Sequence, residues 1–203
     1  MADAMMADAA ADTPAPRLGA LDGRHAGTAM VRVLPAAPAA RVSLRADADA
    51  LPAIEAALGM ALPRRIGSSA TEGLRSALCL GPDEWLLIEE WGADALRDAA
   101  TSLNPIADDL AGVDAPHSAV DVSHRNTALL AAGPLAADAI EHGCPRDLSL
   151  DAFPVGACAR TVLGKAEVVL WRGQEDAFRI ECWRSFSTYA MDFMAEAARD
   201  ASA

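Results

Sequence analysis

The sequence lacks a run of apolar residues long enough to cross a membrane, which takes about 20 in a row. Its beginning also lacks the basic and then apolar pattern of a secretory signal. Basic residues are few, with 17 Lys and Arg against 29 Asp and Glu, and the formal net charge is −12. A nucleic-acid backbone requires a basic surface, so this balance argues against nucleic-acid binding. We expect a soluble, cytoplasmic protein that can meet a basic partner surface.

Motifs for cofactors and metals are also missing. No GxGxxG loop follows a predicted strand, so there is no dinucleotide fingerprint. The cysteines form no CxxC pair, and the histidines show no HxxxH or Cys/His ligand spacing. We therefore expect reduced, buried thiols, no zinc site, no bound cofactor and no catalytic residue in this chain. The cysteines are Cys79, Cys144, Cys158 and Cys182, and the histidines are His25, His117, His124 and His142.

The densest polar cluster lies between two predicted strands, at residues 119–122 and 127–132. There Asp121, Ser123 and His124 offer the residue types of a hydrolase triad. Consecutive strand residues point to opposite faces, which would separate the serine from the histidine. We therefore interpret Asp121 and Ser123 as side chains that satisfy backbone groups of a turn.

Composition divides the chain into an N-terminal arm, residues 1–40, and a folded domain, residues 41–203. The arm is rich in Ala, Asp and Pro, which favours a flexible or extended segment. Within it, Met30 to Leu34 is apolar and predicts either an edge strand or a strap that lies on a partner. The domain divides into halves at about 41–103 and 119–199.

Hydrophobic periodicity predicts a β-α-β-β-α order in the first half. Asp49 is a good N-cap residue, and Gly59 ends the helix in which Leu51, Ile54 and Leu58 share a face. The expected elements are a strand at 42–44, a helix from about 49 to 58, strands at 77–80 and 85–88 and a helix at 93–103, with connectors at 60–75 and 104–116.

The second half repeats this order. Gly143 is expected to end its first helix in a left-handed conformation. Ser185 is expected to cap the last helix, with Phe186, Tyr189 and Phe193 turned inward. The expected elements are a strand at 127–132, a helix at 134–142, strands at 159–163, 166–171 and 177–182, and the C-terminal helix. The predicted fold class is α+β, with two ferredoxin-like halves packed together.

The strand at 177–182 alternates apolar residues with Arg179, Glu181 and Trp183, which predicts a half-buried strand. Trp183 then lies on the polar face, either as a sheet-face residue or as an anchor for a partner. Arg172, Arg179 and Arg184 gather near the last hairpin. They are interpreted as a solvated face, although arginine also suits buried interface pairs.

Several ordered blocks resemble one known family, the gamma subunit of heterotetrameric sarcosine oxidase. The resemblance covers roughly residues 40–199, and the family is related in fold to the folate-binding aminomethyltransferase of the glycine cleavage system. The blocks are Leu-Gly-Pro-Asp-Glu-Trp-Leu at 80–86, Asp-Val-Ser-His at 121–124, Gly-Pro-x-Ala at 133–136, Gly-Cys at 143–144, Phe-Pro-x-Gly at 153–156, Arg-Thr at 160–161 and Arg-Ser-Phe-x-x-Tyr at 184–189.

The resemblance implies a noncatalytic structural subunit of a cytoplasmic complex. Such a complex demethylates sarcosine oxidatively to glycine and passes the one-carbon unit to tetrahydrofolate. The implied partners are the alpha, beta and delta subunits, and FAD, FMN, NAD and tetrahydrofolate would be held in these other subunits. The alternatives are a folate-dependent aminomethyltransferase-like protein, a folate-binding accessory protein, and the gamma subunit of a related N-methyl amino acid dehydrogenase.

One turn bears on the folate alternative. Aminomethyltransferases carry an acidic residue just after the glycine of the first turn in the second-half sheet, whereas here Lys165 follows Gly164. This difference favours a structural subunit that works through its surface. The residues predicted to form the partner interface are Met30, Val31, Leu34, His124, Arg125, Trp183 and Arg184.

Overall fold

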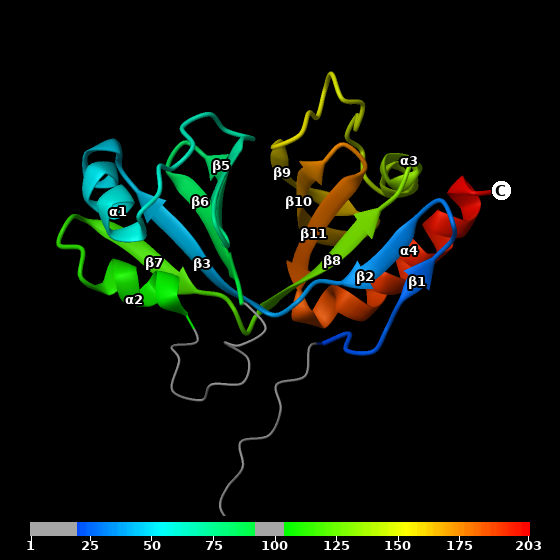
Figure 1. Cartoon of the computed structure of the whole chain (residues 1–203), viewed down its shortest axis with the longest axis horizontal. Coiled ribbons are helices and arrows are strands. Elements are labelled where there is room, and N and C mark those ends of the chain that lie inside the picture. The colour runs from blue at the N-terminus through cyan, green and yellow to red at the C-terminus, as the bar shows by residue number, and fades with distance from the viewer. Residues whose placement is uncertain (1–19, 92–103) are drawn as a thin grey trace, which may run out of the picture.

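The computed structural model describes residues 20–91 and 104–203, which form a mixed α+β fold built on two antiparallel sheets (Figure 1). The first sheet has five strands in the order β4-β5-β6-β3-β7. The second has six strands in the order β1-β2-β8-β11-β10-β9. No helix within the described ranges is both long enough and apolar enough to cross a membrane. The helix expected at 93–103 lies outside the described residues.

The first sheet and its helices confirm much of the predicted first half. Leu51, Ile54 and Leu58 are buried on one face of α1, and Gly59 ends the helix with a φ of 67°. Asp49 is not its cap, because a short 3-10 turn at Ala48–Ala50 precedes the helix. The elements are β3 (Ala39–Ala46), α1 (Leu51–Leu58), β4 (Ser69–Glu72), β5 (Arg75–Gly81), β6 (Glu84–Glu90), α2 (Pro105–Ala111) and β7 (His117–Asp121).

Two segments expected to be connectors contain regular structure. Residues 60–75 include β4, which pairs with β5 at the edge of the sheet. Residues 104–116 include α2, where the Asn104 side chain accepts a hydrogen bond from the Ala107 backbone N–H and Pro105 occupies the first turn. An Asn followed by Pro is a helix-start signal, so this helix was readable from the sequence.

The second sheet extends further toward the N-terminus than the sequence predicted. β2 pairs with β8 in the register Val33 to Ala131, and Val31 and Val33 are fully buried in the core of this half. Of the two alternatives for residues 30–34, the strand is the one observed, although β2 lies between β1 and β8 rather than at the edge of the sheet. The elements are β1 (Ala26–Gly27), β2 (Arg32–Pro35), β8 (Asn126–Ala132), α3 (Ala136–Glu141), β9 (Cys158–Leu163), β10 (Ala166–Gln174), β11 (Ala177–Trp183), a 3-10 turn (Arg184–Phe186) and α4 (Ser187–Ala201).

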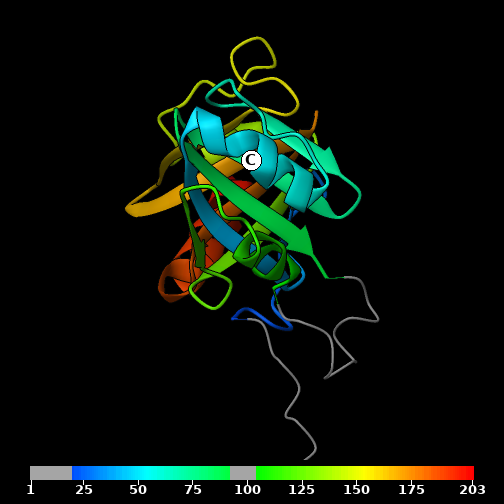
Figure 2. The same cartoon turned by 90° about the vertical axis from the view of Figure 1, so that its left-hand side faces the viewer.

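The two sheets face each other, and the helices lie on the outside. α1 and α2 cover the outer face of the first sheet, and α3 and α4 pack on the second (Figures 1 and 2). This gives three apolar layers, one under each pair of helices and one between the sheets. The layer between the sheets contains the fully buried Leu78 together with Leu86, Ile88, Val122 and Cys158.

The helices of the second half differ from the prediction in their ends and register. α3 begins at Ala136 rather than 134, and Gly143 does not have a positive φ. Glycine is needed at 143 for space, because a Cβ there would lie 2.3 Å from a ring carbon of Phe193. α4 begins at Ser187, so Phe186 and Tyr189 are 41% and 38% exposed instead of turned inward.

Candidate functional site

The polar turn between β7 and β8 joins the two sheets, because β7 belongs to the first and β8 to the second. The Ser123 backbone N–H donates to Asp121 Oδ1 at 2.8 Å. The Ser123 hydroxyl oxygen accepts from the Arg41 backbone N–H at 2.9 Å and from Asn104 Nδ2 at 3.2 Å. The interpretation of Asp121 and Ser123 as turn residues is therefore confirmed. In the described part of the chain neither makes a hydrogen bond to His124, so the arrangement is not that of a hydrolase triad.

The Asp121 carboxylate is stabilised in its charged form. Burial acts to raise its pKa, but hydrogen bonds from Ser123 and Asn104, together with the nearby His124, hold the pKa below its usual value. The turn therefore keeps its hydrogen-bonded acid ionised at neutral pH.

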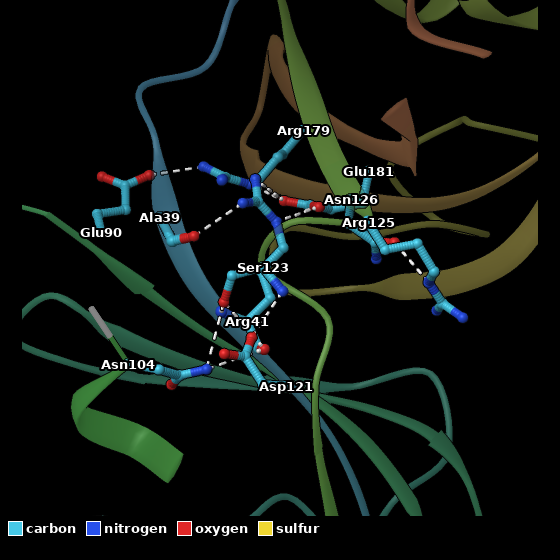
Figure 3. A network of polar contacts seen from close by, with 10 residues as sticks. All are labelled: Ala39, Arg41, Glu90, Asn104, Asp121, Ser123, Arg125, Asn126, Arg179 and Glu181. Carbon is cyan, nitrogen blue, oxygen red and sulfur yellow. Dashed lines mark hydrogen bonds and ion pairs between the residues drawn. The ribbon is translucent and has the colours of Figure 1, made fainter. Parts of the chain in front are cut away.

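A buried ion-pair network spans the space between the sheets immediately above this turn (Figure 3). Glu181 on β11 accepts from Arg41 Nε at 2.7 Å and from Arg41 Nη2 at 3.1 Å, so a two-point contact joins β3 to β11. It also accepts from Arg179 Nε at 2.7 Å. Arg179 Nη1 in turn donates to Glu90 of β6 at 2.6 Å. We call these four residues the seam network.

Burial sets the energetic role of the seam network. The side chains of Arg41, Arg179 and Glu181 are 3%, 4% and 1% exposed, while Glu90 is 52% exposed. Each buried charge loses its hydration, which its partner's attraction and hydrogen bonds must offset. Arg41 and Glu90 belong to the first sheet, and Arg179 and Glu181 belong to the second, so each sheet contributes one charge of either sign. The pairs Arg41–Glu181 and Arg179–Glu90 cross from one sheet to the other, and the network therefore ties the two sheets together at this point.

The solvated-face interpretation is wrong for two of the three arginines near the last hairpin. The alternation of apolar and polar residues along β11 was predicted correctly. The polar side of the strand, however, packs against the other sheet instead of facing water. Arg172 is also buried: its guanidinium donates to the Leu148 and Phe153 carbonyls, both at 2.6 Å, and lies 4.5 Å from the centre of the Phe178 ring. These arginines are buried structural residues.

The predicted interface residues separate into two groups. Val31 is fully buried in its own core, and Met30 is 42% exposed beside it. Near the central turn, however, the Arg125 guanidinium lies 5.1 Å from the centre of the Trp183 ring, and the Arg184 backbone N–H donates to the Arg125 carbonyl at 2.7 Å. His124 is exposed on the same turn, while Leu34 is half-buried in β2.

A cavity of about 380 Å³ lies beside the turn. Ser123, His124 and Arg184 supply polar groups to its wall, and Pro38 and Trp91 supply apolar surface. Its size is at the lower end of the range for small-molecule pockets. Over residues 20–91 and 104–203, no group of three or more His, Cys, Asp or Glu side chains gathers in a way that could hold a metal ion.

The fold has a distant counterpart in an aminomethyltransferase. The glycine cleavage system aminomethyltransferase T from Bartonella henselae superposes with a TM-score of 0.54 at 14% identity, covering 83% of this chain and 48% of the enzyme. At this identity the likeness establishes a shared fold only.

Closer relatives match nearly the whole chain. A gamma subunit of sarcosine oxidase from Corynebacterium sp. strain P-1 is 31% identical over 179 residues, covering 86% of this chain and 82% of the relative. A second, from an Arthrobacter species, is 32% identical over 162 residues, covering 78% and 74%. A chain in the structure of heterotetrameric sarcosine oxidase from Corynebacterium sp. U-96, in complex with pyrrole 2-carboxylate, superposes with a TM-score of 0.72 at 31% identity and coverages of 85% and 86%. The model of the sarcosine oxidase, gamma subunit family matches residues 43–202, and the chain therefore belongs to that family.

Proposed function

We propose that this chain is the gamma subunit of a heterotetrameric sarcosine oxidase and serves the complex as a noncatalytic structural subunit. The observation that carries the proposal is the match to a chain of such an oxidase over 85% of this chain and 86% of the other. The internal structure supports a structural role, because Arg41, Arg179 and Glu181 between the sheets bond to one another, and Ser123 bonds to the backbone of β3.

The complex is proposed to demethylate sarcosine oxidatively to glycine and to pass the one-carbon unit to tetrahydrofolate in the cytoplasm. The alpha, beta and delta subunits would be its partners and would hold FAD, FMN, NAD and tetrahydrofolate. The absence of a dinucleotide loop from the sequence supports placing these cofactors outside this chain. A related N-methyl amino acid is the alternative substrate of such a complex.

The turn between β9 and β10 argues against folate chemistry in this chain itself. Lys165 stands where the related aminomethyltransferases are expected to carry an acid, and its backbone N–H donates to Tyr189 Oη at 3.0 Å. The turn is thereby tied to α4 rather than presented to a ligand.

We further infer that both halves are ferredoxin-like. The first half follows the order β3-α1-β5-β6-α2-β7 with sheet order β7-β3-β6-β5, as that fold requires. The second half reaches the same sheet order, β2-β8-β11-β10, when β2 takes the place of a strand after α4. The N-terminal segment thus completes the C-terminal half.

Co-expression tests the proposal. The four subunits should purify as one complex that oxidises sarcosine, and the isolated gamma chain should oxidise neither sarcosine nor another N-methyl amino acid. Sarcosine turnover by the isolated chain would contradict the noncatalytic role. Failure of the chain to co-purify with the other subunits would contradict its place in the complex.

A further inference from the structure

The few aromatic residues of this chain are unevenly distributed. Aromatics make up 4% of the sequence, nine residues in all, and all nine lie in the described ranges. Three of them, Trp183, Phe186 and Tyr189, are exposed, by 45%, 41% and 38%. They follow one another from the end of β11 into the start of α4, which Figure 1 shows as one continuous path. We call Trp183, Phe186 and Tyr189 the aromatic ridge.

The ridge is held in place although it is exposed. The Trp183 and Phe186 ring centroids are 6.2 Å apart, and Tyr189 lies 6.2 Å from Phe193 further along the helix. Tyr189 Oη accepts the Lys165 backbone N–H, and the Ser187 hydroxyl donates to the Arg184 carbonyl at 2.7 Å. Binding to a surface that is already ordered costs less side-chain entropy, so fixed aromatic groups are effective anchors.

Positive charge surrounds the ridge in a chain that is strongly acidic. Arg125 stacks on Trp183, Arg184 precedes Phe186, and Lys165, the only lysine of the sequence, adjoins Tyr189. None of these three cations forms an ion pair with a described residue, whereas Arg160 and Arg45 are paired with Glu84. The exposed Glu167 also lies near this end of β10. The three cations outnumber this one carboxylate, so the net charge of these four side chains is positive.

We propose that the aromatic ridge with Arg125 and Arg184 is the surface on which another subunit of the complex docks a carboxylate-bearing segment. An apolar side chain of that segment would pack on Trp183 and Phe186, and its carboxylates would meet the two guanidinium groups. The inference rests on the proposed function and adds the chemistry of the partner. Trp, Tyr and Arg are the residues most enriched at interface hot spots, and cations that form no ion pair within the described residues favour an acidic occupant.

Substitutions at the ridge test the proposal in the assembled complex. Trp183→Ala and Phe186→Ala should each weaken association of the gamma chain with the remaining subunits by about tenfold or more, as expected for hot-spot residues. Arg184→Glu should weaken it more than Arg184→Ala, because glutamate would repel the partner's carboxylates. The matched controls are Leu74→Ala, at a 58% exposed residue on the β4–β5 hairpin, and Arg65→Glu, and both should bind like the native chain.

Lys165 supplies a second readout that does not depend on substitutions. An amine-reactive ester should acylate Lys165 in the free chain and much less in the complex, as measured by peptide mass spectrometry. Folding of each variant is checked by circular dichroism, because the substituted side chains are exposed and should leave the fold intact.

The outcomes separate this inference from the proposed function. If the native chain does not enter the complex, the proposed function fails. If the native chain enters the complex but ridge variants bind equally well and Lys165 is not protected, the ridge proposal alone is overturned. Equal losses for Arg184→Glu and Arg184→Ala would overturn the acidic partner. A change in Trp emission on removing residues 1–19, together with native binding by the ridge variants, would make the chain's own N-terminus the occupant and overturn the proposal.

Discussion

Replacing Glu181 with glutamine is the sharpest perturbation of the seam network. Glu181 is 1% exposed and accepts three hydrogen bonds from two buried arginines. The amide keeps the shape of the side chain but removes the negative charge, which leaves two buried guanidinium groups with only Glu90 nearby. Removing one partner of a buried ion pair costs about 3–5 kcal/mol. That loss is a large fraction of the roughly 5–15 kcal/mol that stabilises a typical domain.

The same network provides matched controls. Glu90→Gln removes a partner that is 52% exposed, so its cost should be about 0–1 kcal/mol. The triple variant Arg41→Met, Arg179→Met and Glu181→Leu should recover most of the loss, because apolar residues of similar volume remove the desolvation penalty of all three charges. Recovery should be incomplete, since the Ala39 carbonyl loses the hydrogen bond from Arg41.

Urea denaturation followed by tryptophan fluorescence and by far-ultraviolet circular dichroism measures these differences. If Glu181→Gln loses no more stability than Glu90→Gln, the two buried arginines do not need the charge of Glu181 to offset their lost hydration. The seam network would then not be what docks the sheets.

Three other variants or conditions have defined outcomes. Gly143→Ala should destabilise the chain by about 1–3 kcal/mol, because its Cβ would lie 2.3 Å from a Phe193 ring carbon. The control is Gly112→Ala, whose Cβ would meet open space, and it should be neutral or slightly stabilising. Thermal melts compare the two variants. Asn104→Ala should cost about 0.5–2 kcal/mol through loss of the α2 cap, measured as the urea midpoint. Burial raises the pKa of the Cys158 thiol from 9.0 to about 12, so its contribution to stability should be complete below about pH 9 and decline as the pH rises toward 12. A Cys158→Ser chain should lose part of the alkaline dependence, while the part from Cys182, whose pKa burial also raises to about 12, should remain; an unchanged profile would refute the prediction.

Local periodicity was sufficient for most strands and for the faces of α1. Leu51, Ile54 and Leu58 recur at helical spacing, and clear turn signals separate the last three strands of the chain, β9, β10 and β11. The position of β2 could not be predicted in this way, because the apolar residues between 30 and 34 indicate a strand but not the strand with which it pairs. Pairing with β8 is a long-range contact that only the assembled second half creates.

The seam network shows a different limit. Alternation correctly put Arg179 and Glu181 on one face of their strand, but a single strand cannot show that this face meets a second sheet. The available signal was a pair of opposite charges, Arg179 and Glu181, two residues apart on one strand. The sequence did not show that Arg41 on β3 would meet the same glutamate. The aromatic ridge was hidden because the inward face predicted for the last helix was wrong. Ala190, Met191 and Met194 are the residues buried there, which leaves Tyr189 exposed.

Native mass spectrometry of the purified oxidase tests the structural role most directly. The four subunits are co-expressed, with an affinity tag on a subunit other than this chain. We predict a particle that contains one copy of this chain and oxidises sarcosine, and that loses stability or assembly yield when this chain is omitted. A fully assembled particle of the same stability and activity that lacks this chain would contradict the account.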